Sequence, residues 1–231
     1  MRVVGGEWRG RPLTAPRGRG TRPTSDKVRE AMFDVLAALP EARAAAGSAA
    51  AASSRSAAAD GSVEERAGTL AGHVVLDLFA GSGALGIEAL SRGAASCAFV
   101  ENERAALAAL RGNLERLGVP SGRSALARVV AADVRRALQA DARRGARYTL
   151  VFADPPYYRY AEVRPALARL VEPLLAAGAV IVVETAAGTE VELPWTTVRV
   201  KRYGDTRVTF LVTGDEQSVG GAKGEHDVAT G

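Results

Sequence analysis

A glycine-rich turn between two apolar segments constrains the fold of this chain more than any other feature. Residues 74–79 form an apolar run typical of a buried strand, and residues 84–92 have the pattern of a helix. Between and within them, Gly81, Gly83 and Gly86 match G-x-G-x-x-G, and an acid, Glu101, follows twenty positions after Gly81. Glycines let a backbone turn tightly and approach a ligand closely. The sequence therefore predicts a ligand-binding turn at the carboxyl edge of an α/β sheet.

Strand and helix patterns alternate from residue 74 onward. We expect strands at 74–79, 96–100, 127–131, 148–153 and 179–184, and helices at 84–92, 103–117, 134–144 and 161–176. This alternation predicts parallel strands joined by crossover helices. After Trp195, residues 197–203 and 206–212 flank Gly204-Asp205 and predict a hairpin. The expected fold is a doubly wound, Rossmann-like α/β sheet, mostly parallel, with an antiparallel C-terminal hairpin strand.

Two segments lack the large apolar residues that a core requires. Segment 41–68 is rich in alanine and serine, and segment 214–231 is polar and rich in glycine. We expect the first to be a flexible insertion, with an exposed alanine-rich helix over part of it as the alternative. The second is expected to be a disordered tail. The chain then divides into a basic extension at 1–22, one α/β domain at 23–213 and the tail at 214–231.

Asp77 indicates which ligand the glycine turn binds. An oxidoreductase that binds a dinucleotide would fit the glycines equally well, but a carboxylate just before the turn would repel a pyrophosphate. Asp77 suits instead the cationic methionine moiety of S-adenosylmethionine (SAM). Glu101 ends the second strand and can accept hydrogen bonds from ribose hydroxyls; its alternative is a solvated acid at a helix start.

The run from Asp77 to Gly83 resembles the SAM-binding motif of class I methyltransferases, whose sheet also ends in an antiparallel strand. The resemblance implies that Glu101 holds the ribose and that Asp133, after the third strand, contacts the adenine amine. Asp133 could equally cap the helix that starts near Val134. The loop residues that the resemblance assigns to the cofactor are Phe79, Gly81, Ser82 and Gly83.

A second motif follows the fourth expected strand. Asp154-Pro155-Pro156-Tyr157 places a carboxylate and an aromatic ring on a loop that two prolines stiffen. The carboxylate and a backbone carbonyl can accept hydrogen bonds from an amino group, and the ring can stack on a base. The four residues resemble the Asp/Asn-Pro-Pro-Tyr/Phe motif of methyltransferases that act on exocyclic amines of nucleobases. The alternative is a proline-rich turn with a capping aspartate.

Positive charge is concentrated at the amino end. Residues 1–22 contain one acid, Glu7, and six arginines: Arg2, Arg9, Arg11, Arg17, Arg19 and Arg22. With Trp8 as a stacking ring, they predict a mobile arm that binds RNA phosphates and unpaired bases; the alternative is a solvated basic terminus. Next, Thr24 or Ser25 can cap a helix whose buried stripe includes Met32 and Leu36 and leaves Arg29 outside it.

Several classes of protein are disfavoured by the composition. The sequence contains no run of about eighteen apolar residues, so we expect no membrane-spanning helix. One cysteine, Cys97, and two separated histidines, His73 and His226, argue against a zinc site and a disulfide and favour a reducing cytoplasm. Cys97 is expected to be a packing residue. We expect a monomer without a metal.

Nearly the whole chain resembles one bacterial family, the RsmD 16S ribosomal RNA guanine-N2 methyltransferases. The matching pieces are 2–6, 22–30, 77–90, 154–157 and 203–206. The resemblance implies a SAM-dependent enzyme that methylates a guanine amine of small-subunit RNA during ribosome assembly. Two alternatives remain open at this stage: an amino methyltransferase that acts on adenine or cytosine in DNA or another RNA, and a non-catalytic RNA-binding assembly factor.

Overall fold

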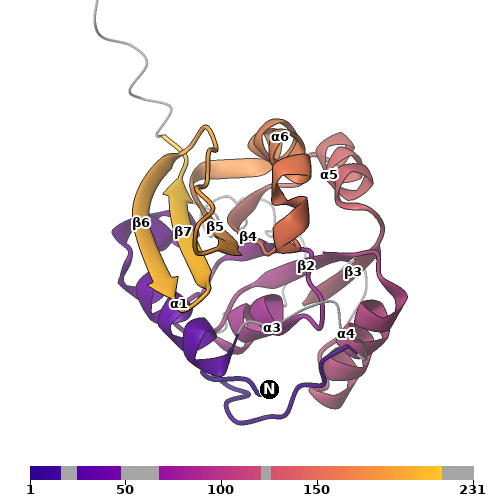
Figure 1. Ribbon diagram of the computed structural model, residues 1–231. Helices are drawn as coiled ribbons and strands as arrows, with labels where there is room; N and C mark the ends of the chain where they lie inside the picture. The colour runs from indigo at the N-terminus through magenta and orange to yellow at the C-terminus, as the bar shows by residue number, and fades with distance from the viewer. Residues whose placement is uncertain (17–24, 48–67, 121–125, 215–231) are drawn as a thin grey trace, which may run out of the picture.

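A seven-stranded sheet forms the centre of the protein in the computed structural model, which describes residues 1–16, 25–47, 68–120 and 126–214 (Figure 1). The strand order is β3-β2-β1-β4-β5-β7-β6, in which the first five strands are parallel and β7 is antiparallel to both β5 and β6. The bounds are β1 Val74–Leu78, β2 Ser96–Glu101, β3 Ala127–Ala131, β4 Tyr148–Ala153, β5 Leu175–Ala186, β6 Thr196–Tyr203 and β7 Thr206–Val212. The predicted fold is confirmed.

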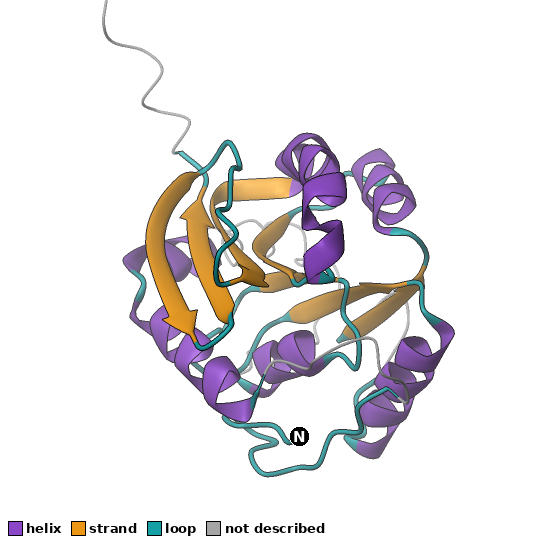
Figure 2. Cartoon of the chain, viewed as in Figure 1, coloured by secondary structure: helices purple, strands orange, loops and turns teal. Residues whose placement is uncertain are grey.

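Helices cover both faces of this sheet (Figure 2). Helices α1 (Asp26–Ala38), α3 (Ala84–Ser91) and α4 (Arg104–Arg116) share one apolar cluster with the sheet, in which the rings of Phe33 and Phe152 lie 5.5 Å apart. Helices α5 (Val134–Arg143) and α6 (Tyr160–Val171) share the opposite cluster through Leu138 and Leu167. The alternation of side chains along each strand therefore sends successive residues into different layers.

The last predicted helix, 161–176, ends too late. Helix α6 stops at Val171, a short 3-10 turn (η2) spans Glu172–Leu174, and β5 already begins at Leu175. Pro173 lacks the backbone N–H that a continuing α-helix would need, so the chain leaves the helix here. Strand β5 is consequently longer than the predicted 179–184.

The N-terminal segment, residues 1–16, is packed against the domain and is not the mobile arm that we expected. Val3, Trp8 and Leu13 are buried in the α1–α3–α4 cluster. Backbone atoms of this segment bond side chains of α3: the Val4 N–H donates to Glu88 at 2.8 Å, and the Trp8 N–H donates to Ser91 at 2.9 Å. The segment runs along the helices at the lower side of Figure 1. Residues 17–24 lie outside the described part.

A buried charge network joins this segment to α1, and it corrects the expected position of Arg29. Ser25 caps α1 and Met32 and Leu36 are buried, as predicted, but Arg29 is also fully buried. Its guanidinium donates to Asp26 at 2.9 Å and lies 3.7 Å from Glu88. Burying a charge is costly unless it is paired, and these partners supply the pairing.

The insertion is partly helical. Residues 40–47 are helical, with Ala42 and Ala45 buried, so the first part of segment 41–68 is packed and not flexible. The alanine-rich helix that we kept as an alternative is therefore present, with one side buried and with Arg43 and Ala44 exposed. Residues 48–67 lie outside the described part. So do residues 215–231, which are all but the first residue of the predicted tail. Within the residues that the structure does describe, no helix is long and apolar enough to cross a membrane.

Candidate active site

The glycine turn lies where β1 gives way to α3, at the carboxyl edge of the sheet. Gly81 and Gly83 have φ angles of 57° and 82°, a left-handed conformation that glycine adopts without strain. At Gly83 a Cβ atom would also stand 2.3 Å from the Leu110 Cδ1 atom. Phe79 shares the left-handed conformation, with a φ of 60°, although it is not glycine. Such strained positions concentrate at functional loops.

Asp77 lies beneath this turn. Its side chain is 1% exposed, and its carboxylate accepts a hydrogen bond of 2.9 Å from the Gly86 N–H. Burial raises the pKa of Asp77 to about 7, against the lowering effect of that hydrogen bond. The carboxyl group thus supports the turn from inside, and it places a proton-binding group close below the expected cofactor.

The two other predicted cofactor acids stand at the ends of β2 and β3. Glu101 accepts hydrogen bonds from the backbone N–H groups of Gly81, at 2.8 Å, and of Glu103, at 2.8 Å. It therefore connects the glycine turn to the start of α4. Asp133 caps α5 by accepting from the Arg135 N–H at 2.9 Å, so the capping alternative is confirmed. One carboxylate can do this and still offer its second oxygen to a ligand.

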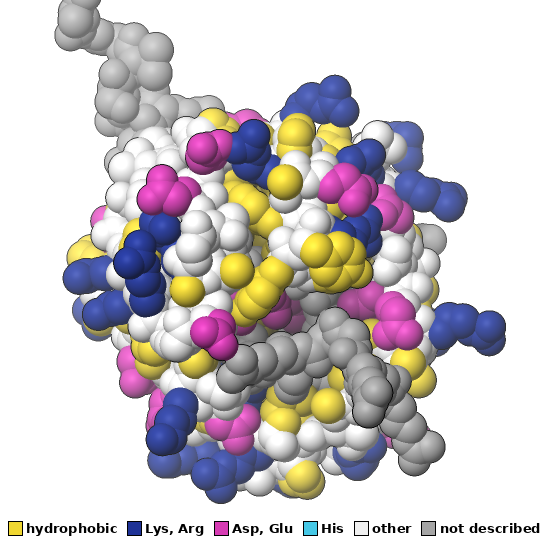
Figure 3. Space-filling view, viewed as in Figure 1, with side chains coloured by type: hydrophobic (Ala, Val, Ile, Leu, Met, Phe, Trp, Pro, Cys, Tyr) yellow, Lys and Arg dark blue, Asp and Glu magenta, His cyan; other side chains and the backbone are white. Residues whose placement is uncertain are grey.

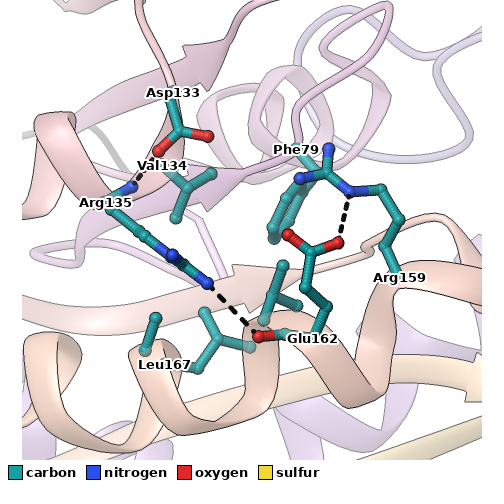
Figure 4. Close-up of a pocket in the computed structure, with 9 residues that line it drawn as sticks. Phe79, Asp133, Val134, Arg135, Arg159, Glu162 and Leu167 are labelled. Atoms are coloured by element: carbon teal, nitrogen blue, oxygen red, sulfur yellow. Dashed lines mark hydrogen bonds and ion pairs between the residues drawn. The ribbon is translucent and has the colours of Figure 1, made fainter.

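A hollow opens between these acids and α6. Phe79, Asp133, Val134 and Arg159 line both its parts; Glu101 and Asn102 lie at one end and Glu162 at the other. Figure 4 shows the Arg159–Glu162 ion pair and the bond from Arg135 to the Glu162 carbonyl, which border it. Apolar walls with convergent acids fit a flat base joined to a sugar that bears hydroxyl groups. The acceptor oxygens and apolar walls therefore suit the chemistry of the adenosine part of SAM.

The Asp154 loop begins directly after β4. Asp154 is partly exposed, and its N–H donates to the Leu78 carbonyl at 3.4 Å. Pro155 is buried, and Pro156 precedes a 3-10 turn (η1, Tyr157–Arg159). The Tyr157 hydroxyl lies 2.9 Å from the Thr206 hydroxyl at the hairpin turn. The structure thus brings the Asp154 loop, the glycine turn and the C-terminal hairpin to one edge of the sheet. Tyr157 is 40% exposed.

A further acid at this edge was missed by the sequence reasoning. Glu184, near the end of β5, is 3% exposed and acts on Asp154 electrostatically. Burial first, then the charges of Glu184 and Asp77, raise the pKa of Asp154 well above its usual range. The signal was present in the sequence, because a lone acid directly follows the apolar run 179–183 at the carboxyl end of a strand.

The predicted RNA-binding residues divide into three groups. Arg2, Arg9 and Arg11 are exposed, although Arg2 lies 3.8 Å from Asp26. Trp8 is 7% exposed and packs in the core, so the prediction that its ring stacks on bases is wrong. Arg17, Arg19 and Arg22 lie outside the described residues. Figure 3 shows further basic side chains over the edge strand β6, where Arg199, Lys201 and Arg202 are exposed.

Two titratable side chains outside the motifs, Cys97 and His73, are both buried. Cys97 is buried on β2, and burial raises the pKa of its thiol, as expected for a packing residue. His73 is buried beside the Thr149 hydroxyl at 3.0 Å, and burial lowers its pKa to about 4. Within the described ranges, no three acids, histidines or cysteines converge as metal ligands.

Comparison with known proteins identifies the family. The family model described as "Conserved hypothetical protein 95" matches residues 1–212. The chain belongs to this family, that of the RsmD methyltransferases. It is 36% identical over 159 residues to ribosomal RNA small subunit methyltransferase D of Escherichia coli K12, covering 69% of this chain and 61% of that one. The Haemophilus influenzae protein of the same name is 30% identical over 207 residues, which are 88% and 89% of the two chains.

A solved structure extends the likeness to three dimensions. The YhhF protein of Escherichia coli, named as a candidate methyltransferase, superposes with a TM-score of 0.67 at 32% identity, over 94% of this chain and 99% of that one. RsmD-family membership disfavours the oxidoreductase alternative, which explained neither Asp77 nor the Asp154 loop.

Proposed function

We propose that the protein transfers a methyl group from SAM to the exocyclic N2 amine of a guanine in 16S ribosomal RNA. The observation that carries the proposal is the ordered Asp154–Tyr157 loop, which lies at the same sheet edge as the glycine turn and its acids. Family membership supports it, because relatives in the family are named as small-subunit ribosomal RNA methyltransferases.

The residues that would hold SAM are those of the turn and the hollow. The glycine turn lets the backbone approach the ligand closely, Glu101 offers acceptors for ribose hydroxyls, and Asp133 offers one for the adenine amine. When bound, SAM supplies an activated methyl group on a sulfonium leaving group. Burial raises the pKa of Asp77 and of Asp154, and a cationic ligand bound beside them would favour their ionised forms.

Asp154 acts on the amine. The lone pair of guanine N2 is conjugated with the ring, so the nitrogen is a poor nucleophile. Asp154 and the Pro155 carbonyl would accept its two hydrogens and favour a pyramidal nitrogen whose lone pair points outward. Tyr157, held at its hydroxyl by Thr206, would stack on the extruded base. Positioning then carries much of the rate enhancement.

The exposed basic residues would bind the RNA backbone. Arg9 and Arg11 of the N-terminal segment and Arg199, Lys201 and Arg202 of β6 are exposed cations at the surface. Such side chains neutralise phosphates and make binding sensitive to salt. We propose that the protein acts in the cytoplasm, as a monomer, on an assembly intermediate of the small subunit.

The test is methyl transfer from tritiated SAM to small subunits, naked 16S RNA and DNA, followed by digestion and identification of the labelled base. Label in N2-methylguanine from the RNA is expected. Asp154→Ala should abolish or greatly reduce transfer and leave SAM affinity within about threefold, whereas Asp154→Asn keeps one acceptor oxygen and should retain more activity.

Other outcomes would revise the proposal. Label in adenine or cytosine would keep the chemistry and change the substrate. RNA binding with no transfer to any of the three substrates would favour a non-catalytic assembly factor. Parental rates in both Asp154 variants would reduce that residue to a turn-former.

A further inference from the structure

Glu184 stands beside Asp154 in the sheet. Strands β4 and β5 pair in parallel, with Phe152 opposite Val182 and Ala153 opposite Val183. The next residue after each of these is an acid: Asp154 directly follows β4, and Glu184 lies on β5. Neighbouring parallel strands are about 4.8 Å apart, so two side chains at the same level on the same face can reach each other.

The two acids also project to the same face. Phe152 and Val182 belong to the apolar cluster under α1 and α3, whereas Ala153 and Val183 belong to the opposite cluster. Side chains alternate along a strand, so Glu184 returns to the face of Val182, and the charges of Glu184 and Asp77 both act on the Asp154 carboxyl group from this face. Glu184 is almost entirely buried and Asp154 is partly exposed, so Glu184 lies behind Asp154 as seen from solvent.

Two carboxylates in such a place cannot both ionise easily. Burial and the charge of Glu184 are the two largest causes that raise the pKa of Asp154. A side-by-side carboxyl pair titrates as a unit and keeps one proton over an intermediate range of pH.

Other charged groups on the surrounding elements do not reverse the rise in the pKa of Asp154. Asp77 on β1 and Glu101 on β2 add negative charge to the same face. On β7, Arg207 precedes Val208, the partner of Glu184, and lies 3.6 Å from Glu190. Helix α1 also packs on this face; it carries Asp26 and Arg29, which pair with each other, and the exposed Lys27, Glu30 and Asp34.

We propose that Glu184 is a positioning residue that shares one proton with Asp154, so that the hydrogen-bonded pair holds the Asp154 carboxylate towards the target amine. The proposal rests on the proposed role of Asp154. Glu184 donates through the shared proton, and Asp154 keeps its outward oxygen for the amine hydrogen. When the pair loses its proton at alkaline pH, the two anions repel each other and Asp154 loses its alignment.

The activity test compares the pH dependence of kcat in Glu184→Gln, Glu184→Ala and the parent. The parent rate should fall at alkaline pH. The amide N–H of Glu184→Gln cannot titrate, so this variant should not show the alkaline fall and should be more active than Glu184→Ala. In Glu184→Ala, loss of a hydrogen bond to a charged group should lower kcat about tenfold or more, with KM for SAM and RNA within about threefold.

Glu190→Gln is the matched control, because Glu190 is exposed in the loop after the same strand. Its pH profile should match that of the parent. A parent and a Glu184→Gln profile that coincide, or an unchanged kcat in Glu184→Ala, would overturn the shared proton.

An infrared measurement tests the pair without any substrate. In an Asp77→Asn background, which removes the other buried carboxyl group with a raised pKa, the C=O stretch of a protonated carboxyl group should be present near neutral pH, and it should be lost when either Glu184→Gln or Asp154→Asn is added. Its persistence in either of those two variants overturns the pair. Because this readout does not depend on catalysis, failure of the pair and failure of the proposed guanine methylation give different results.

Discussion

Asp77 gives the stability of the protein a specific dependence on pH. Its pKa of about 7 in the folded state exceeds the ordinary value of 3.8, so the folded state keeps a proton that the unfolded state has lost between these values. The protonated group stabilises the fold fully below about pH 4, and this stabilisation is lost as the pH rises through 7.

Asp77→Asn retains an acceptor oxygen for the Gly86 N–H but cannot ionise. The unfolding free energy of the variant minus that of the parent should therefore be larger at about pH 8 than at about pH 5. The increase should be a few kcal/mol, at roughly 1.4 kcal/mol per pKa unit. Urea denaturation at the two pH values measures this. The buried His73 has the opposite dependence, but it is present in both proteins and cancels. A difference in unfolding free energy that does not vary with pH would contradict the raised pKa.

The residues that sequence reasoning located are those whose chemistry coincides with a local pattern. Glu101 and Asp154 each end an apolar run, and Asp133 precedes a helix, so their positions followed from periodicity. Trp8 and Arg29 were misjudged, because their burial depends on α3, which lies far away in the sequence. Glu184 was missed although it directly follows an apolar run, because that pattern does not show its place beside Asp154, which depends on the register of β4 with β5.

At the scale of elements, helix α4 ties the N-terminal segment to the glycine turn through Asn113. This fully buried side chain donates to the Ser82 carbonyl at 2.9 Å and to the Thr14 carbonyl at 3.0 Å, and accepts from the Thr14 N–H at 2.8 Å. Asn113→Ala removes all three bonds. We expect SAM affinity to weaken severalfold to about tenfold, because the position of the turn is less well defined.

Arg116→Ala is the control one turn further along α4. Arg116 contacts Thr14 and Asn113 but is not bonded to Ser82. SAM affinity measured by calorimetry should change little in this variant. If Asn113→Ala binds SAM as the parent does, the link from α4 does not position the turn.

The elements themselves were predicted well where the period was clear. Strands β1 to β4 and the hairpin were located from apolar runs, and their boundaries agree within a residue or two. The errors lie at α6 and β5, where a proline ends the helix early, and in segment 41–68, where burial does not follow a pattern of large apolar residues. Ala42 and Ala45 illustrate this, since alanine is small enough to be buried against another element without any apolar periodicity.

On the scale of the whole molecule, the N-terminal segment has its partners late in the chain. Val4, Trp8 and Thr14 bond residues that follow them by 84, 83 and 99 positions. Contacts of such long range close large loops and tend to form late in folding. Trp8→Ala should destabilise the fold by about 3–5 kcal/mol. Most of this loss should accelerate unfolding and leave the folding rate nearly unchanged, as stopped-flow kinetics in denaturant would measure. A comparable slowing of folding would show that the segment docks early.

During synthesis, this order has a consequence for the ribosome-bound chain. The arginines of the N-terminal segment leave the exit tunnel before α3 and α4, whose contacts with the segment join residues 83 to 99 positions apart. Over that interval a short basic peptide is attached to a particle made largely of RNA, with no folded domain behind it. Val3, Trp8 and Leu13 then draw the segment onto the finished domain, and its charges become part of a fixed surface only when the enzyme is complete.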